Sequence, residues 1–150
     1  MNCPYCESSQ VMVVNSRKTS MGSQVWRRRR CNKCKLLFTT HENVNLTHLV
    51  VIKKDGIKER YSRSKLYSGV YSAAVSSRPR ERRELVDKIV REAEKRILLL
   101  NRKEITSEEI GDMVLHSLKK LSPGVFLGYL TYHKNIEKTS QIKKEIKKYL

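Results

Sequence analysis

Residues 24–35 read QVWRRRRCNKCK, so four consecutive arginines lead directly into a Cys-x-x-Cys pair. A second Cys-x-x-Cys pair lies near the start of the chain, and together the two pairs offer four thiolates to one metal ion. Four thiolates are typical of a tetrahedral structural zinc site, which keeps no open position for catalysis. A rubredoxin-like iron site, a labile redox pair and buried free thiols are the weaker alternatives. The pattern therefore predicts one structural Zn²⁺ bound by Cys3, Cys6, Cys31 and Cys34.

The charge of the chain points to a polyanionic partner. It has 150 residues with 32 Lys and Arg against 15 Asp and Glu, a formal net charge of +17. Nucleic acid is a better candidate than a membrane surface for such a balance. The sequence has no apolar run of membrane-spanning length and no signal-peptide pattern, so we expect a cytoplasmic protein with no membrane partner. In that compartment cysteines serve as metal ligands more often than as disulfides.

The cysteines also divide the chain, because all four lie in the first 34 residues. Residues 1–46 contain β-prone runs at 11–17 and 24–31, with a turn expected at residues 21–23. Residues 41–48 have no clear period and are interpreted as a linker. The sequence predicts an α+β protein: a small metal-bound β domain followed by a mainly helical domain that begins with a β-hairpin. The predicted boundaries are 1–46, 49–139 and a basic amphipathic tail, 140–150.

The arginine run is expected to form a strand, in which alternate side chains point to opposite faces. Such a ribbon is basic on both faces and can reach across a phosphate backbone, with one or two arginines at guanine edges. A solvated, highly soluble face is the alternative. Trp26 could stack on a base, but we expect it in the core of this small domain. The predicted nucleic acid-binding residues are Arg17, Arg27, Arg28, Arg29, Arg30, Lys33 and Lys35.

Two β-prone runs flank Asp55-Gly56, a strong signal for a hairpin with a two-residue loop. That loop would place Lys53 directly opposite Lys58, and like charges at opposed positions destabilise a hairpin. A polyphosphate bound against them would remove the conflict, although a solvated hairpin tip is equally compatible with the spacing. The chain has neither a P-loop nor a Rossmann glycine motif. Its four histidines are scattered and lack a nucleophile motif, so we expect no enzyme activity.

Beyond the hairpin the sequence predicts only helices. The first has an apolar face of Leu66, Val70, Ala73 and Ala74, and Pro79 interrupts it. The second has Leu85, Val86, Ile89, Val90, Ala93 and Ile97. Thr106 or Ser107 is expected to cap the third helix, and Thr106 with Glu109 would form a capping box. The apolar face of this helix is Ile110, Met113, Val114, Leu118 and Leu121. A fourth helix covers residues 126–136. For the tail, binding to DNA, a contact between subunits and a solvated helix are all open, and we favour the solvated helix.

Several motifs together resemble the NrdR family, bacterial repressors of ribonucleotide reductase genes. They are CPYC (3–6), NSR (15–17), RRRRCNKC (27–34), FTT (38–40) and VVIKKDGIKERYSRSKL (50–66). The resemblance implies a zinc ribbon that contacts double-stranded DNA and an ATP-cone that binds ATP and dATP. It also implies a homo-oligomer whose assembly depends on the nucleotide, with dATP favouring repression.

The resemblance further implies a nucleotide site in the cone. The phosphates would contact Lys53, Lys54 and Lys65. The base and the sugar would lie near Glu59 and Ser62. The strand under the adenine would be Val50, Val51 and Ile52. Ser107 would add a hydroxyl and the N–H groups of a helix start, a natural anion site.

The chain departs from the family at a few positions. Asn15 stands where the family usually has Asp, and Lys54 stands where Arg is common. Leu127, Gly128, Tyr129 and His133 replace family residues in the last helix, and Gly128 removes an arginine.

Two rival functions remain beside a nucleotide-responsive repressor. A zinc-ribbon RNA-binding protein would account for the charge but not for the hairpin motif. An allosteric module that docks on ribonucleotide reductase would bind nucleotide but leave Arg27 to Arg30 without a purpose. We therefore favour the repressor, which would act in the bacterial cytoplasm and be nucleoid-associated when bound.

Overall fold

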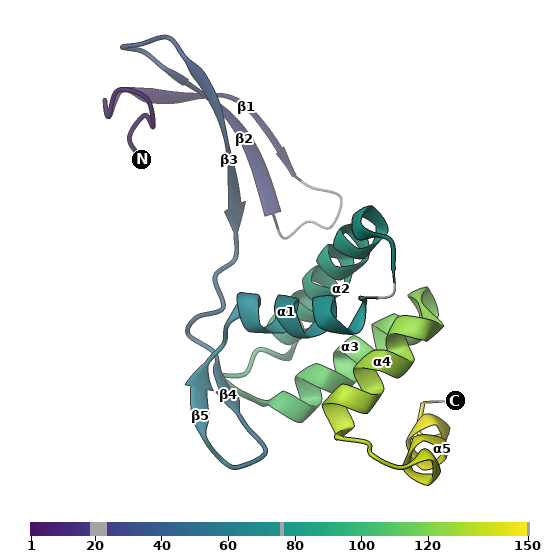
Figure 1. Ribbon diagram of the computed structural model, residues 1–150. Helices are drawn as coiled ribbons and strands as arrows, with labels where there is room; N and C mark the ends of the chain where they lie inside the picture. Colours follow the sequence, from purple (N-terminus) through teal and green to yellow (C-terminus); the bar gives the residue numbers. More distant parts are fainter. Residues whose placement is uncertain (19–23, 76, 150) are drawn as a thin grey trace. The chain divides into compact units, whose positions relative to one another are not determined.

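The structure is a computed structural model that describes residues 1–18, 24–75 and 77–149. The turn expected at residues 21–23 lies outside the described residues. The chain divides into two compact units, Met1–Asn45 and Leu46–Leu150. The first is built of strands around a cysteine cluster and the second is mainly helical (Figure 1). The predicted α+β class is confirmed.

The first unit is a three-stranded antiparallel sheet in the order β1-β2-β3. Its strands are β1 (Val11–Lys18), β2 (Gln24–Cys31) and β3 (Leu37–Asn43). The interpretation of residues 41–48 as a linker is wrong at its start, because Trp26 pairs with His41 and the ladder continues to Asn43. The mixed polar sequence there hides a strand that is stabilised by pairing rather than by an apolar face.

The core of this unit is small. Cys3, Cys31 and Phe38 are buried, and the partly buried side chains around them are Cys6, Val11 and Cys34. Trp26, which we expected in this core, lies outside it and is only half-buried. Its indole ring is instead covered by the guanidinium of Arg17, 5.9 Å from the ring centroid. So little apolar burial contributes only modestly to stability.

The second unit begins with a small sheet in the order β5-β4-β6. It contains β4 (Val50–Ile52), β5 (Lys58–Arg60) and β6 (Glu104–Thr106). The hairpin of β4 and β5 was predicted, but β6 corrects the expectation that only helices follow it. This strand runs parallel to β4, with Ile52 opposite Thr106. Three residues are too few to display a strand period in the sequence.

The register of the hairpin differs from the predicted one by one residue. Ile52 pairs with Lys58, and the Lys53 N–H donates to the Ile57 carbonyl at 2.9 Å. The loop therefore has three residues and ends at Gly56, whose φ of +84° suits a residue without Cβ. Lys53 and Lys58 are consequently not opposed, and the like-charge conflict does not arise.

The helical part confirms the predicted apolar faces with one exception. Its helices are α1 (Arg63–Ala73), α2 (Pro79–Leu100), α3 (Ser107–Leu121), α4 (Pro123–Lys134) and α5 (Thr139–Lys147). Val70, Ile89, Val114 and Leu118 are fully buried in one cluster contributed by α1 to α4. Leu121, expected on the buried face, is 40% exposed. None of the described helices has the length and apolar character needed to cross a membrane.

The tail is packed, which corrects the expectation of a solvated helix. Ile146 and Tyr149 lie against the helical core, and the Tyr149 ring meets Phe126 edge to face with centroids 5.7 Å apart. The Tyr149 hydroxyl donates to Asp112 Oδ1 at 2.6 Å. Its main-chain carbonyl accepts a hydrogen bond from Lys119. Residues 139–149 are therefore part of the second unit rather than a free appendage.

Candidate functional site

The four cysteines form a site that fits zinc. Their Sγ atoms all lie within 4.8 Å of one another, and the Sγ atoms of Cys3 and Cys34, like those of Cys6 and Cys31, are 3.6 Å apart. Tetrahedral coordination with Zn–S bonds of about 2.3 Å separates ligand atoms by about 3.8 Å. No pair forms a disulfide, since all four are free.

The backbone of both Cys-x-x-Cys knuckles suits a metal site. The residue after each knuckle, Glu7 or Lys35, adopts a left-handed conformation with φ of 58° or 62°. In the second knuckle, the N–H groups of Cys34 and Lys33 donate to the Cys31 sulfur and hold its pKa at about 6. The pKa of Cys34 moves the opposite way, to about 12, because burial and hydrogen bonds with the other three sulfurs favour its thiol, so the cluster geometry is what fits a metal.

The arginine run lies on β2 as predicted, and its faces alternate. Arg27 and Arg29 share one face, where both contact the carboxylate of Glu42 at 2.8 and 3.1 Å. Arg28 points to the opposite face and donates to Thr39 Oγ1 at 3.0 Å. Of the other predicted contacts, Arg17 lies on β1, whereas Lys33 and Lys35 are exposed around the second knuckle.

A pocket with a cavity volume of about 200 Å³ lies in the second unit, where its small sheet meets the helices. Because β6 runs parallel to β4, it delivers the start of α3 next to the hairpin. Ser62, the N-cap of α1, and Ser107, the first residue of α3, both line the cavity. Two helix N-termini thus border one pocket, and each favours a bound anion.

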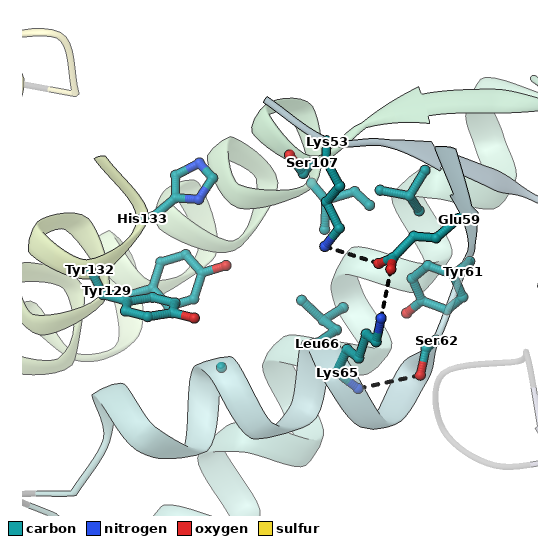
Figure 2. A pocket seen from close by; sticks show the side chains of 13 residues that line it. Lys53, Glu59, Tyr61, Ser62, Lys65, Leu66, Ser107, Tyr129, Tyr132 and His133 are labelled. Carbon is teal, nitrogen blue, oxygen red and sulfur yellow. Dashed lines mark hydrogen bonds and ion pairs between the residues drawn. The ribbon is translucent and has the colours of Figure 1, made fainter. Parts of the chain in front are cut away.

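Ion pairs in this pocket centre on Glu59. Its carboxylate accepts from Lys65 Nζ at 2.6 Å and from Lys53 Nζ at 2.9 Å (Figure 2). These two bonds, that of Lys65 first, lower the pKa of Glu59. The carboxylate occupies the position between two ammonium groups that a phosphate would also favour. It thereby orients the two ammonium groups toward the cavity.

The structure brings together most of the predicted nucleotide-binding residues but not all of them. Six of the nine line this cavity: Val51, Lys53, Glu59, Ser62, Lys65 and Ser107. Lys54 lines an adjoining cavity of about 570 Å³ that shares Lys53, Glu59 and Ser107. Val50 and Ile52 line neither cavity, because strand alternation turns them away from Val51.

The wall facing the charged cluster was missed by sequence reasoning. Tyr129, Tyr132 and His133 of α4 lie across the pocket from Glu59 and Lys65 (Figure 2). The rings of Tyr129 and His133 stack with centroids 5.7 Å apart. Burial lowers the pKa of His133, and the nearby cations Lys134 and Lys54 lower it further. An aromatic run in a helix was the only signal for this wall, and it equally suits a core face.

Comparisons with known proteins cover both units. A model described as the N-terminal domain of transcriptional repressor NrdR-like proteins matches residues 1–42, and one of the ATP cone domain matches residues 49–147. A transcriptional repressor NrdR from Gloeothece citriformis (strain PCC 7424) is 36% identical over 133 residues, 89% of this chain and 73% of that protein. One from Streptococcus pneumoniae (strain Hungary19A-6) is 33% identical over 142 residues, 95% of this chain and 89% of that protein.

The chain belongs to the NrdR family of transcriptional repressors. Its first unit is the zinc ribbon of this family and its second the ATP cone. The predicted family is therefore confirmed over both units.

Gly128 is the departure from the NrdR pattern that the structure explains best. A Cβ at this position would lie 3.1 Å from the main-chain oxygen of Ala73. In this NrdR chain α4 therefore approaches the last turn of α1 closely, and a larger side chain needs that backbone contact to give by a few tenths of an ångström. The arginine that the resemblance implies at this position would need the same adjustment.

The resemblance implies that Lys54 contacts a phosphate, but in the structure Lys54 contacts α4. Its Nζ donates to the main-chain oxygen of His133 at 2.7 Å, which ties the hairpin loop to the end of α4. The hairpin loop is thereby held against α4 beside the adjoining cavity that Lys54 lines. An ammonium group has three N–H donors, so Lys54 can keep this bond and still offer a donor to a phosphate.

Proposed function

We propose that this NrdR-family chain is a nucleotide-responsive repressor of ribonucleotide reductase genes. Its zinc ribbon binds operator DNA upstream of those genes, and its cone binds ATP or dATP. The nucleotide sets how the subunits of a homo-oligomer assemble and therefore how the ribbons are spaced. By linkage, operator DNA changes nucleotide affinity by the same factor.

The pocket of the second unit is the observation that carries the proposal. Two helix N-termini and the ammonium groups of Lys53 and Lys65 converge on one cavity, which an aromatic wall borders on the other side. Helix N-termini and lysines suit a polyphosphate, and Tyr129 or Tyr132 offers a ring to a base. Both parts of a nucleoside triphosphate thus have chemically matched partners.

The chemistry proposed here is binding and not catalysis. The four thiolates would hold one Zn²⁺ as a structural ion, which fixes the second knuckle at the end of β2. The ribbon then presents its guanidinium groups from a rigid strand. Such a protein acts in the cytoplasm and associates with the nucleoid when it is bound to DNA.

Fluorescence anisotropy of the zinc-loaded protein tests the proposal. The probes are DNA from upstream of the organism's own ribonucleotide reductase genes and a scrambled duplex, each without nucleotide, with ATP, and with dATP plus ATP. We expect selective binding to the first DNA, strongest with dATP and weaker at high salt. Equal binding to both duplexes that is indifferent to nucleotide would contradict the proposal and redirect it to RNA or the reductase.

A pair of lysine variants tests the nucleotide site itself. Lys53→Ala removes a pocket ammonium group, and we expect ATP affinity to fall about tenfold or more, as befits loss of a charge-assisted contact. Lys58→Ala is the matched control, because Lys58 pairs with Glu104 and does not line the pocket. Equal losses in both variants, measured by calorimetry, would place the nucleotide elsewhere.

A further inference from the structure

The two faces of the ribbon sheet differ in how their guanidinium groups are compensated. The Glu42 face comprises Arg27, Arg29, Thr40 and Glu42, which the register of β2 and β3 places on one side. Glu42 contacts both arginines, and Arg29 also donates to Thr40 Oγ1 at 2.9 Å. The Arg29 side chain is only 15% exposed. These two arginines are therefore bound within the sheet.

The opposite side, the Trp26 face, includes Asn15, Arg17, Trp26, Arg28, Arg30, Thr39 and His41, with the exposed apolar side chains of Met12 and Leu37 on either side of Arg30. In the described strands of the ribbon, no Asp or Glu points to this face. Arg28 donates to the neutral hydroxyl of Thr39, so its charge is not compensated. Arg30 is exposed, and Arg17 lies over the indole of Trp26.

We propose that the ribbon docks on double-stranded DNA through the Trp26 face, with Arg17, Arg28 and Arg30 on the phosphates. Arg27 and Arg29 then stabilise the ribbon instead of contacting DNA. This inference rests on the proposed function and assigns the face that performs it.

Electrostatics and geometry both favour this face. A guanidinium paired with a carboxylate has part of its charge already compensated, and the carboxylate beside it repels a phosphate, whereas one bonded to a hydroxyl keeps its full charge for the ligand. The guanidinium of Arg17, whose central carbon lies 5.9 Å from the Trp26 ring centroid, has N–H donors that can reach a phosphate oxygen. Lys18 lies on the Glu42 face and adds one cation there, without a fixed donor geometry.

The test compares two double variants that each remove two positive charges from β2. Arg28→Gln/Arg30→Gln alters the Trp26 face, and Arg27→Gln/Arg29→Gln alters the Glu42 face. Operator affinity of the full-length protein is measured by anisotropy across a salt series. Because each phosphate contact adds about 0.9 to the slope of log K against log salt, we expect the Trp26-face variant to flatten that slope by about 1.8.

The affinity of the Trp26-face variant should fall about tenfold or more at moderate salt, and that of the other variant less than about threefold. Equal losses, or a larger loss for the Glu42-face variant with its zinc content intact, would overturn the face assignment. If the Glu42-face variant loses zinc, Glu42→Gln replaces it, because this change frees Arg27 and Arg29 without removing them. An unchanged salt slope for Glu42→Gln supports the proposal, and a slope steeper by about two contradicts it.

The wild-type protein separates this inference from the proposed function. If it fails to select operator over scrambled DNA, the proposed function fails irrespective of the face. If it selects the operator and only the order of the variants is reversed, the face assignment alone fails. An RNA duplex of operator sequence forms a further arm, and preferential binding to it would overturn the choice of DNA as the partner.

Discussion

The ribbon and the cone reach stability by different physical routes within one chain. The ribbon core has one large apolar side chain, Phe38, beside its cysteines, and the apolar residues 12–14 on β1 remain exposed. The cone buries aliphatic side chains from four helices in a continuous cluster. A metal site replaces buried apolar area in the first case, since zinc binding is itself folding free energy. Loss of metal and loss of packing should therefore act on different units.

The largest expected effect comes from removing one metal ligand. Cys31→Ser should abolish zinc binding, worth on the order of 10–16 kcal/mol in small zinc modules, and unfold the ribbon while the cone still binds ATP. Trp26 is the one tryptophan of the chain, so its fluorescence reports the ribbon alone. A ribbon that stays folded without zinc would show that the metal is not the main source of its stability.

A cavity in the cone should destabilise the cone and leave the zinc ribbon intact. Leu115→Ala deletes a fully buried side chain, and we expect the free energy of unfolding to fall by about 2–5 kcal/mol. Denaturant titration followed by far-UV circular dichroism measures the change. Leu99→Ala is the control, because Leu99 is 75% exposed, and zinc content should stay at wild-type stoichiometry in both. Loss of zinc from the Leu115 variant would mean that the two units do not fold independently.

A smaller effect is expected where the pocket wall joins the packed core of the cone. A Cβ at Gly111 would lie 2.0 Å from atoms of the His133 ring, so Gly111→Ala must displace the imidazole. Overpacking of this kind lowers the free energy of unfolding by about 1–3 kcal/mol. The higher helix propensity of alanine over glycine offsets about 1 kcal/mol of that loss. Gly69→Ala adds the same methyl group with nothing within 4 Å. The measurement is the thermal unfolding of both variants. Equal stability would show that the His133 ring can move aside at little cost in free energy.

The smallest effect concerns pH. Burial keeps the pKa of His133 below its ordinary value, so between that lowered pKa and about 6.5 the unfolded chain binds more protons. Stability associated with His133 is thus present at neutral pH and lost as pH falls below about 6.5.

His133→Gln should flatten the fall in unfolding temperature between about pH 7.5 and 5.5. His116→Gln, at an exposed site of α3, should retain the wild-type slope. Zinc loss in acid affects both variants alike, so their difference isolates His133. Identical slopes would contradict the assignment of a depressed pKa.

The contrast between the units also shows where sequence reasoning succeeded. The four-cysteine cluster could be predicted because metal chemistry prescribes both residue type and local spacing. The helical faces of α2 and α3 and the capping box of Thr106 were equally readable, since period and capping are local properties. The hairpin was predicted, but its register was wrong because the Asp-Gly signal does not distinguish a two-residue loop from a three-residue one.

What failed depended on contacts between distant segments. Trp26 was expected in a core, yet a cation from the neighbouring strand covers it instead. The tail was expected in solvent, yet Tyr149 finds Asp112 and Phe126 on the helical core. None of these three partners is a near neighbour in sequence, so no periodicity could reveal the contacts.

The sequence alone determined the four-cysteine cluster, the family and the division into a β unit and a helical unit, because each follows from local residue chemistry. The tertiary structure alone decided that Glu59 lies between Lys53 and Lys65, that Ser107 reaches the hairpin, and that Glu42 binds two of the four arginines. The physical reason is the pairing of strands. The register of β5 on β4 sets Glu59 beside Lys53, the parallel pairing of β6 with β4 brings Ser107 to the same pocket, and the register of β3 on β2 places Glu42 beside Arg27 and Arg29.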